Sequence, residues 1–378
     1  MEPRMSVTIP TSLRPIDGRF GSGPSRLRTS QLAYLREAEP GILGTSHRKA
    51  PVRSLVAKIQ EQLLTLFRAP AGYEIVLGNG GSSAFWDIAA YSLIEHRSQS
   101  LEFGVFGERF TRAARAPWLA APSVRRAAHG SLSSPTHEQG IDVYAWPENE
   151  TSTGVAAPVR RVAPPEEALT IIDATSSAGG VEFDPTQVDA YYFAPQKNLG
   201  SDGGLWIALL SPAAIARAEQ IAASDRHIPD FLSLSRAITN SRAHQTTNTP
   251  ALATLLLLEN QLDWILGNGG LAWAAERTGT SSSLIYEWAE ASTFATPFVS
   301  TPALRSRVNA TIEIAPTVNV RELSHALRAN GIVDVDAYSG VGSNQLRIAT
   351  YVSVEPEDVT RLLSCIDTVY SRLAEHAC

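Results

Sequence analysis

One lysine of the sequence stands in a setting that suits covalent chemistry. Lys197 follows the short apolar segment 190–193, within the stretch Ala194-Pro195-Gln196-Lys197-Asn198-Leu199-Gly200. Proline and glycine constrain this loop, and a lysine held there can form a Schiff base with a carbonyl group if its surroundings lower the pKa of its amine. Taken alone, a lysine in a loop is more often a solvated surface residue.

An aspartate earlier in the chain makes the covalent interpretation stronger. Asp173 ends the apolar run 169–172 and precedes Ala174-Thr175-Ser176-Ser177. Burying a carboxylate without a cationic partner is costly. A protonated pyridine nitrogen would provide that partner, and the aspartate would keep such a ring an electron sink. An aspartate that merely caps the next turn is an equal alternative at this point.

A glycine-rich segment lies between a predicted strand and a predicted helix. Gly78-Asn79-Gly80-Gly81-Ser82 follows the apolar run 73–77 and precedes the helix-like stretch 83–94, with serine as the expected N-cap. Glycines let the backbone approach a phosphate, and the free N–H groups at a helix start favour the anion. The segment lacks the lysine of a nucleoside-triphosphate loop, which disfavours that ligand class.

The elements that must position these residues alternate along the chain. Short apolar segments bounded by turn residues predict buried strands at 73–77, 101–106, 143–146, 169–172, 190–193 and 205–210. Helix-length stretches separate several of them, which predicts an α/β fold: a mostly parallel central sheet with helices on both faces. The carboxyl ends of its strands should carry the active site.

A second, smaller α+β unit is predicted in the last third of the chain. Gly267-Asn268-Gly269-Gly270 interrupts the pattern, and the helix-like stretch 271–291 bridges into the new unit. The expected elements there are strands at 308–314 and 345–348, a helix at 321–329 and an amphipathic final helix. We therefore predict a large domain at 17–266 and a small C-terminal domain at 267–378, on which residues 1–16 either pack or hang free.

Composition excludes several functional classes. The 378 residues carry a formal net charge of −6, and 44% of them are hydrophobic and 19% charged, which is typical of a folded protein. This charge argues against nucleic-acid binding, which needs clustered Lys and Arg. The basic pairs Arg125-Arg126 and Arg160-Arg161 are interpreted as solvated surface residues.

Cysteine content and apolar runs indicate a cytoplasmic protein. The two cysteines, Cys365 and Cys378, build neither a disulfide framework nor a zinc site, and no metal ion is expected. No apolar run reaches the ~20 residues of a membrane span. Residues 1–10 lack the pattern of a signal peptide, so neither export nor membrane association is expected.

Several stretches of the chain together resemble one enzyme family. They are Gly21-Ser22-Gly23-Pro24, Ser46-His47-Arg48, Asn149-Glu150-Thr151, Asp173-Ala174-Thr175-Ser176-Ser177, Ala194-Pro195-Gln196-Lys197-Asn198 and Asn248-Thr249-Pro250. The resemblance is to the phosphoserine aminotransferases, class V members of the pyridoxal-phosphate superfamily of fold type I. It runs through most of the chain and looks most like the actinobacterial branch.

The resemblance implies pyridoxal 5′-phosphate as the cofactor. Lys197 would form the Schiff base and shuttle a proton between the substrate Cα and the cofactor C4′, while Asp173 would pair with the pyridine nitrogen. The other implied cofactor contacts are Gly81, Ser82 and Gln196 at the phosphate, Thr151 at the ring oxygen, and Phe106 stacked on the ring. Many members carry tryptophan at this last position, and phenylalanine keeps its stacking face, although an aromatic at a strand end is more often plain core. Asn248 and Thr249 would reach the phosphate of a neighbouring subunit, which implies a homodimer with shared active sites.

The implied reaction is reversible amino transfer from L-glutamate to 3-phosphohydroxypyruvate, giving 2-oxoglutarate and O-phospho-L-serine in serine biosynthesis. Both amino acids carry an α-carboxylate and a distal anion, so the pocket needs at least two cationic anchors, preferably bidentate arginines. The family pattern assigns Ser22, His47 and Arg48 to the substrate, with Arg48 at the distal anion, and gives Arg347 the α-carboxylate. Without the family, an arginine at a strand end is more often a surface ion-pair residue.

Two departures leave the distal anion short of partners. Ser82 stands where many members place an arginine, and no histidine matches the one they use near Gly340. We hypothesise that Arg109 or Arg242 substitutes, because both lie close in sequence to cofactor-site segments.

Three alternatives to this function need to be weighed. Another fold type I aminotransferase, such as an alanine–glyoxylate aminotransferase, would need no second anion site, whereas Ser46-His47-Arg48 favours acidic substrates. A cysteine desulfurase needs a mobile nucleophilic cysteine, and neither Cys365 nor Cys378 suits that role. A noncatalytic protein on this scaffold would bind a phosphorylated ligand without turnover and would tolerate the loss of Lys197 and Asp173.

Overall fold

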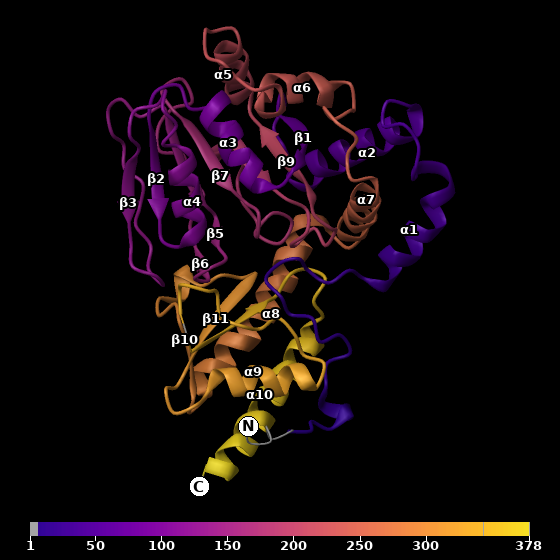
Figure 1. The fold of residues 1–378 in the computed structure, drawn as a ribbon, viewed down its shortest axis with the longest axis vertical. Coiled ribbons are helices and arrows are strands. Elements are labelled where there is room, and N and C mark those ends of the chain that lie inside the picture. The colour runs from indigo at the N-terminus through magenta and orange to yellow at the C-terminus, as the bar shows by residue number, and fades with distance from the viewer. Residues whose placement is uncertain (1–6, 343, 378) are drawn as a thin grey trace.

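A seven-stranded sheet forms the centre of the larger part of the molecule in the computed structural model, which describes residues 7–342 and 344–377 (Figure 1). Its strands, in spatial order, are β1 (Glu74–Gly80), β9 (Gly204–Leu210), β8 (Ala190–Phe193), β7 (Leu169–Asp173), β4 (Val143–Pro147), β2 (Ser98–Glu102) and β3 (Ser123–Arg126). Only β9 runs against its neighbours, while the other pairs are parallel. The predicted α/β class with a mostly parallel sheet is confirmed.

Helices cover both faces of this sheet. On one face lie α1 (Thr29–Ile42), α2 (Ala50–Leu66) and α7 (Leu252–Gly267), and on the other lie α3 (Ser82–Ser92), α4 (Val105–Ala113), α5 (Pro212–Ala222) and α6 (Leu234–Arg242). Successive strand residues point to opposite faces, so Ile172 and Tyr191 belong to one hydrophobic cluster and Ile171 and Tyr192 to the other. Because both faces of the sheet are covered, the central strands β4, β7, β8 and β9 are largely apolar, whereas β2 and the edge strand β3 are mostly polar.

A three-stranded antiparallel sheet organises the smaller part of the molecule. Its elements are β10 (Ala295–Pro297), β11 (Asn309–Ile314), β12 (Gln345–Ala349), α9 (Val320–Ala329) and α10 (Pro356–Ala377), and α8 (Gly270–Ala291) leads into it from the larger part. The remaining elements are the hairpin of β5 (Asn149–Glu150) and β6 (Val155–Ala156) and short 3-10 helices at Thr11–Leu13, Pro185–Gln187, Asp230–Leu232 and Pro302–Leu304. Among the described residues, no helix is long and apolar enough to cross a membrane.

The N-terminal segment packs on this smaller part. Val7, Ile9 and Phe20 belong to its hydrophobic cluster, and the backbone N–H of Ile9 donates to Asn330 Oδ1 at 2.9 Å. Residues 1–6 lie outside the described residues. The division into domains at 17–266 and 267–378 stays a prediction, and its boundary falls between α7 and α8.

The prediction of a loop over Gly78–Gly80 is wrong. These residues complete strand β1, which pairs with β9 as far as Gly80 and Gly204. Gly78 is required for packing, because a Cβ there would lie 2.3 Å from the Trp206 ring. Helix α3 begins at Ser82, and its N-cap is Gly81 rather than a serine. Tertiary pairing therefore overrides the local turn propensity of glycine.

The predicted strand at 101–106 also ends earlier than expected. Strand β2 stops at Glu102, and Phe106 lies in the first turn of α4 rather than at a strand end. The prediction of solvated surface residues at Arg160-Arg161 is correct for Arg160, which is exposed, but wrong for Arg161, which is largely buried and donates hydrogen bonds to the buried Asp189. Inside the protein, the positive charge of Arg161 and the negative charge of Asp189 compensate each other.

Candidate active site

A cavity of about 420 Å³ opens at the carboxyl ends of the parallel strands, which is where ligands bind in sheets of this type. Nine of the predicted site residues line it: Ser22, Gly81, Ser82, Phe106, Thr151, Asp173, Gln196, Lys197 and Arg347. Residues that sequence reasoning did not assign also line it, among them Trp86, Asn149, Thr175, Ser176 and Tyr338. The loops after β7 and β8 and the hairpin β5–β6 converge here.

Lys197 lies at the base of this cavity. Its side chain is buried, and its Nζ donates to Thr151 Oγ1 at 3.2 Å and lies 5.4 Å from the centre of the Phe106 ring. Burial lowers the pKa of Lys197 to about 8, with Asp173 opposing the shift and Arg347 adding to it. Gly23 makes room for the lysine, because a Cβ at its positive φ would lie 3.0 Å from Lys197 Cε.

This pKa predicts how fast the lysine reacts with an aldehyde. The neutral amine is the nucleophile, so the initial rate of covalent attachment of pyridoxal phosphate to cofactor-free protein should rise with pH and level off above about 8. Nα-acetyl-lysine, measured in parallel, should become more reactive until the pH reaches about 10.4, the ordinary pKa of a lysine amine. Stopped-flow absorbance between pH 6.5 and 10 measures both, and a protein profile that follows the free amino acid would contradict the burial argument.

Asp173 is held by hydrogen bonds on both carboxylate oxygens. Its Oδ1 accepts from the Thr175 backbone N–H at 2.9 Å and from the Thr175 hydroxyl, and its Oδ2 accepts from Trp86 Nε1 at 3.2 Å. Ser82 Oγ lies 2.6 Å from the same threonine hydroxyl. Trp86 and Ser82 are four residues apart on α3 and so share one helix face, a spacing that could have indicated the tryptophan.

Arg347 reaches the cavity from β12 of the smaller part. Its Nη1 donates to the Thr151 carbonyl at 3.2 Å, while its buried Nε has no hydrogen-bond partner among the described residues. The Tyr338 ring lies 5.0 Å from its guanidinium. Burial lowers the pKa of Arg347, and an anion in the cavity would compensate that burial.

The other four predicted residues lie outside this cavity in a single chain. His47 Nδ1 lies 3.1 Å from Thr249 Oγ1, and the Asn79 side chain links the backbone of Asn248 and Thr249 at 3.4 and 2.9 Å. Asn248, Thr249 and the nearby Arg48 are exposed. The four residues thus gather at an exposed surface beside β1.

The two candidate substitute arginines differ in position. Arg109 lines the cavity, and its guanidinium lies 5.5 Å from the Phe106 ring centre. Arg242 binds Glu74 at the start of β1, at the end of the strand opposite to Gly80, with Nη2 2.8 Å from the carboxylate. The hypothesis for Arg242 is therefore wrong, because sequence proximity to residues 248 and 249 placed it at the wrong end of the sheet.

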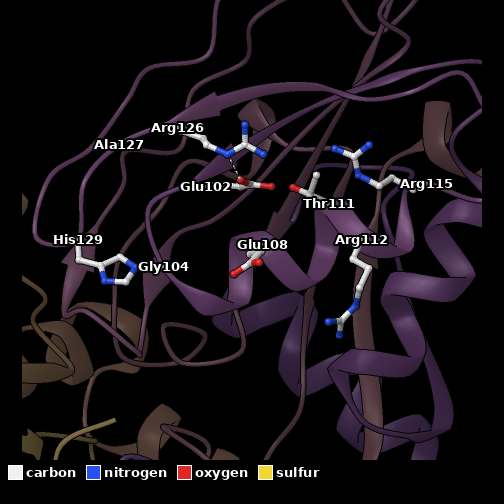
Figure 2. A pocket seen from close by; sticks show the side chains of 9 residues that line it. All are labelled: Glu102, Gly104, Glu108, Thr111, Arg112, Arg115, Arg126, Ala127 and His129. Carbon is white, nitrogen blue, oxygen red and sulfur yellow. Dashed lines mark hydrogen bonds and ion pairs between the residues drawn. The ribbon is translucent and has the colours of Figure 1, made fainter. Parts of the chain in front are cut away.

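A separate depression of about 460 Å³ runs along another face of α4 (Figure 2). Arg112 and Arg115 line it, together with Arg126 and Glu102, which form an ion pair at 2.7 Å. No predicted site residue lies there. The cavity around Lys197 is therefore the candidate active site.

Comparison with known proteins defines the class. Residues 26–340 match the model of the class-V aminotransferases, and the chain belongs to this family. A relative from Mycobacterium sp. strain KMS, described as a putative phosphoserine aminotransferase, is 54% identical over 97% of this chain and 99% of its own length. A relative from Nocardioides sp., described as a phosphoserine aminotransferase, is 52% identical over 97% of this chain and 99% of its own length.

Solved structures share the fold. A phosphoserine aminotransferase from Cytophaga hutchinsonii superimposes with a TM-score of 0.85 at 24% identity, over 92% of this chain and 97% of that one. One from Bacillus circulans gives a TM-score of 0.79 at 22% identity, over 93% and 98%. The predicted fold type I architecture is confirmed.

Pyridoxal 5′-phosphate is the cofactor of this family of enzymes, and the cavity fits it. Lys197 offers a buried amine of lowered pKa for the aldehyde, and Asp173 offers a fixed carboxylate for the ring nitrogen. Ser22 Oγ and Gln196 Oε1 are buried without hydrogen-bond partners among the described residues. Such orphaned polar atoms require a ligand or water to satisfy them.

Proposed function

We propose that this enzyme is a phosphoserine aminotransferase that acts in the cytoplasm in serine biosynthesis. It would transfer the amino group from L-glutamate to 3-phosphohydroxypyruvate and form 2-oxoglutarate and O-phospho-L-serine. One observation carries the proposal: the cavity around Lys197 and Asp173 contains two guanidinium groups, Arg109 and Arg347, and neither forms an ion pair with a described residue. Two separate cations match a substrate that is anionic at both ends.

The residues of the chain divide the chemistry between them. Bound pyridoxal phosphate would supply an electron sink for the electron pair left at the substrate Cα when its proton is removed. Lys197 would remove and return the proton at the substrate Cα, because an amine with a pKa of about 8 serves as both base and acid near neutral pH. Thr151 orients the lysine Nζ, and Asp173 would keep a ring nitrogen protonated. Arg347 would grip the α-carboxylate with its unpartnered Nε.

Arg109 is the proposed cation for the distal phosphate within the chain. Loss of a charge-assisted hydrogen bond costs ~1.5–3 kcal/mol, so Arg109→Gln should raise the KM for phosphoserine by about 10- to 100-fold and change kcat little. Arg242→Gln is the matched control and should leave both constants unchanged, because Arg242 binds Glu74 instead. Steady-state kinetics of both variants test this assignment of Arg109. An unchanged KM for phosphoserine in Arg109→Gln would refute it.

We also propose a homodimer in which each chain completes the other's cavity. His47, Arg48, Asn248 and Thr249 carry cationic and polar groups, gather on one surface, and do not line the cavity of their own chain. A second copy related by a twofold axis would bring this cluster to the neighbouring cavity. The cluster would then supply further contacts to the two phosphates.

Mixing of two inactive variants tests the shared sites. Lys197→Ala and Arg48→Ala chains, unfolded and refolded together at equal amounts, should recover about a quarter of the wild-type sites, because half of the dimers are mixed and each mixed dimer has one intact site. Each variant refolded alone is the control and should stay nearly inactive. A mixture no more active than its parts would contradict shared sites.

The proposed reaction is tested by product formation. Enzyme supplied with glutamate and 3-phosphohydroxypyruvate should release 2-oxoglutarate, measured by a coupled dehydrogenase assay. Alanine with glyoxylate is the comparison pair and should be turned over at least about 100-fold less efficiently, since it carries no distal anion. A preference for alanine and glyoxylate would refute the phosphoserine assignment and leave the family unchanged.

A further inference from the structure

Helix α4 has no side-chain cap of its own, because its N-cap residue is Gly104. The N–H groups of its first turn are bound instead by side chains of the β5–β6 hairpin segment. Val105 N–H donates to Ser152 Oγ at 3.0 Å, and the N–H groups of Phe106 and Gly107 each donate to Glu150 Oε2 at 3.0 Å. These are the donors that a helix start leaves unsatisfied.

Glu150 is fully buried and accepts on both oxygens. Its Oε1 accepts from the Ser152 backbone N–H at 3.2 Å and from the Ser152 hydroxyl at 2.5 Å. Burial raises the pKa of Glu150, and the hydrogen bonds that it accepts from the backbone N–H groups of Phe106, Gly107 and Ser152 oppose this rise by favouring the ionised carboxylate. The start of a helix stabilises such a charge. Gly104 is needed for this contact, because a Cβ there would lie 2.3 Å from Glu150 Cγ.

The contact joins two walls of the active-site cavity. Helix α4 carries Phe106 and Arg109, and the hairpin segment carries Thr151 next to Glu150. Lys197 Nζ lies between these walls, 3.2 Å from Thr151 Oγ1 and 5.4 Å from the Phe106 ring centre. Because Glu150 accepts from the backbone N–H of Phe106 itself, a change in Glu150 should shift the ring relative to the lysine.

We propose that Glu150 is a positioning residue that acts through Phe106. By fixing the backbone of Phe106, it would hold the phenyl ring in the position from which it can stack on the cofactor. The inference rests on the proposed function only for the role of Phe106 toward pyridoxal phosphate. Glu148 provides a control, since it is also buried, lies two residues earlier in the chain, and accepts a hydrogen bond at its Oε2 from the Tyr191 hydroxyl at 2.7 Å, away from α4.

The test uses isosteric variants and two readouts other than turnover. Cofactor-free Glu150→Gln should bind pyridoxal phosphate about tenfold more weakly, because the amide accepts on only one atom and carries no charge at the helix start. The visible circular dichroism of its bound cofactor should also change. Glu148→Gln should keep both the wild-type affinity and the wild-type spectrum.

A double-variant comparison separates positioning from general destabilisation. In a Phe106→Ala background, Glu150→Gln should have no further effect on the affinity for pyridoxal phosphate, because the ring through which Glu150 acts is gone. The inference is overturned by a wild-type affinity in Glu150→Gln, by an equal loss in Glu148→Gln, or by a full tenfold loss in the Phe106→Ala background. Wild-type protein that fails to bind pyridoxal phosphate would instead refute the proposed function.

Discussion

Lys197→Ala should abolish covalent attachment of pyridoxal phosphate and lower kcat by roughly 10⁴-fold, the upper range for loss of a general acid–base group. The side chain is buried and faces Thr151 and Phe106, and within the described part of the chain no other lysine lines the cavity to replace it. Rapid-quench or long-time assays measure the residual rate. The fold should persist, because truncation removes a long side chain whose amine makes one hydrogen bond to the residues that the structure describes, namely to Thr151.

The chain allows an unusually clear control for this result. It has three lysines, Lys49, Lys58 and Lys197. Borohydride reduction of the loaded protein, followed by peptide mass spectrometry, should find the cofactor on Lys197 alone, and Lys49→Ala should behave as wild type. Cofactor trapped on Lys49 or Lys58, or full activity in Lys197→Ala, would contradict the assigned role.

Asp173→Asn should retain the cofactor on Lys197 and lower kcat by about 10³-fold, in keeping with the ~3–5 kcal/mol lost when one member of a buried ion pair is removed. Asparagine has the same shape but no charge for a ring nitrogen. In either amide orientation, the NH₂ group of asparagine would also face an N–H donor, that of Trp86 or of Thr175, at a position where a carboxylate oxygen now accepts a hydrogen bond. Steady-state kinetics and the visible spectrum together measure the effect.

Asp189→Asn is the matched control for the aspartate. Asp189 is also buried, and it binds Arg161 at the other end of β8, outside the cavity. This variant should lower the thermal midpoint of unfolding while keeping kcat within about twofold, because it affects only a structural pair. If both variants lose the same activity, the loss at Asp173 reflects stability and not chemistry.

The juxtaposition of Asp173 and Lys197 could be predicted from the sequence. Both follow apolar runs, and parallel neighbouring strands bring their carboxyl ends to one edge, as β7 and β8 do here. The start of α4 could not be predicted. Its cap is Glu150, over forty positions downstream, so the local sequence at Gly104 carries no helix signal.

Sequence reasoning did not place two further side chains correctly, for a similar reason. Tyr338 reaches the cavity from the smaller part of the molecule and contacts the Arg347 guanidinium. It lies outside any strand or helix, so no sequence pattern predicts its position. Arg242 was placed wrongly because nearness in sequence says little about which end of a strand a residue faces. Residues brought together by tertiary packing alone leave no periodic pattern to find.

The most direct test of the proposed function is the absorbance spectrum of the loaded protein during titration with single amino donors. Each competent donor converts the visible band of the bound cofactor to the band of its amine form. Phosphoserine and glutamate should remove the visible band. Serine and alanine should leave it nearly unchanged, because they lack a distal anion that could bind Arg109 or the partner chain's His47 and Arg48. Conversion by alanine or serine at concentrations as low as those of phosphoserine would contradict the two-anion pocket and the assigned substrate.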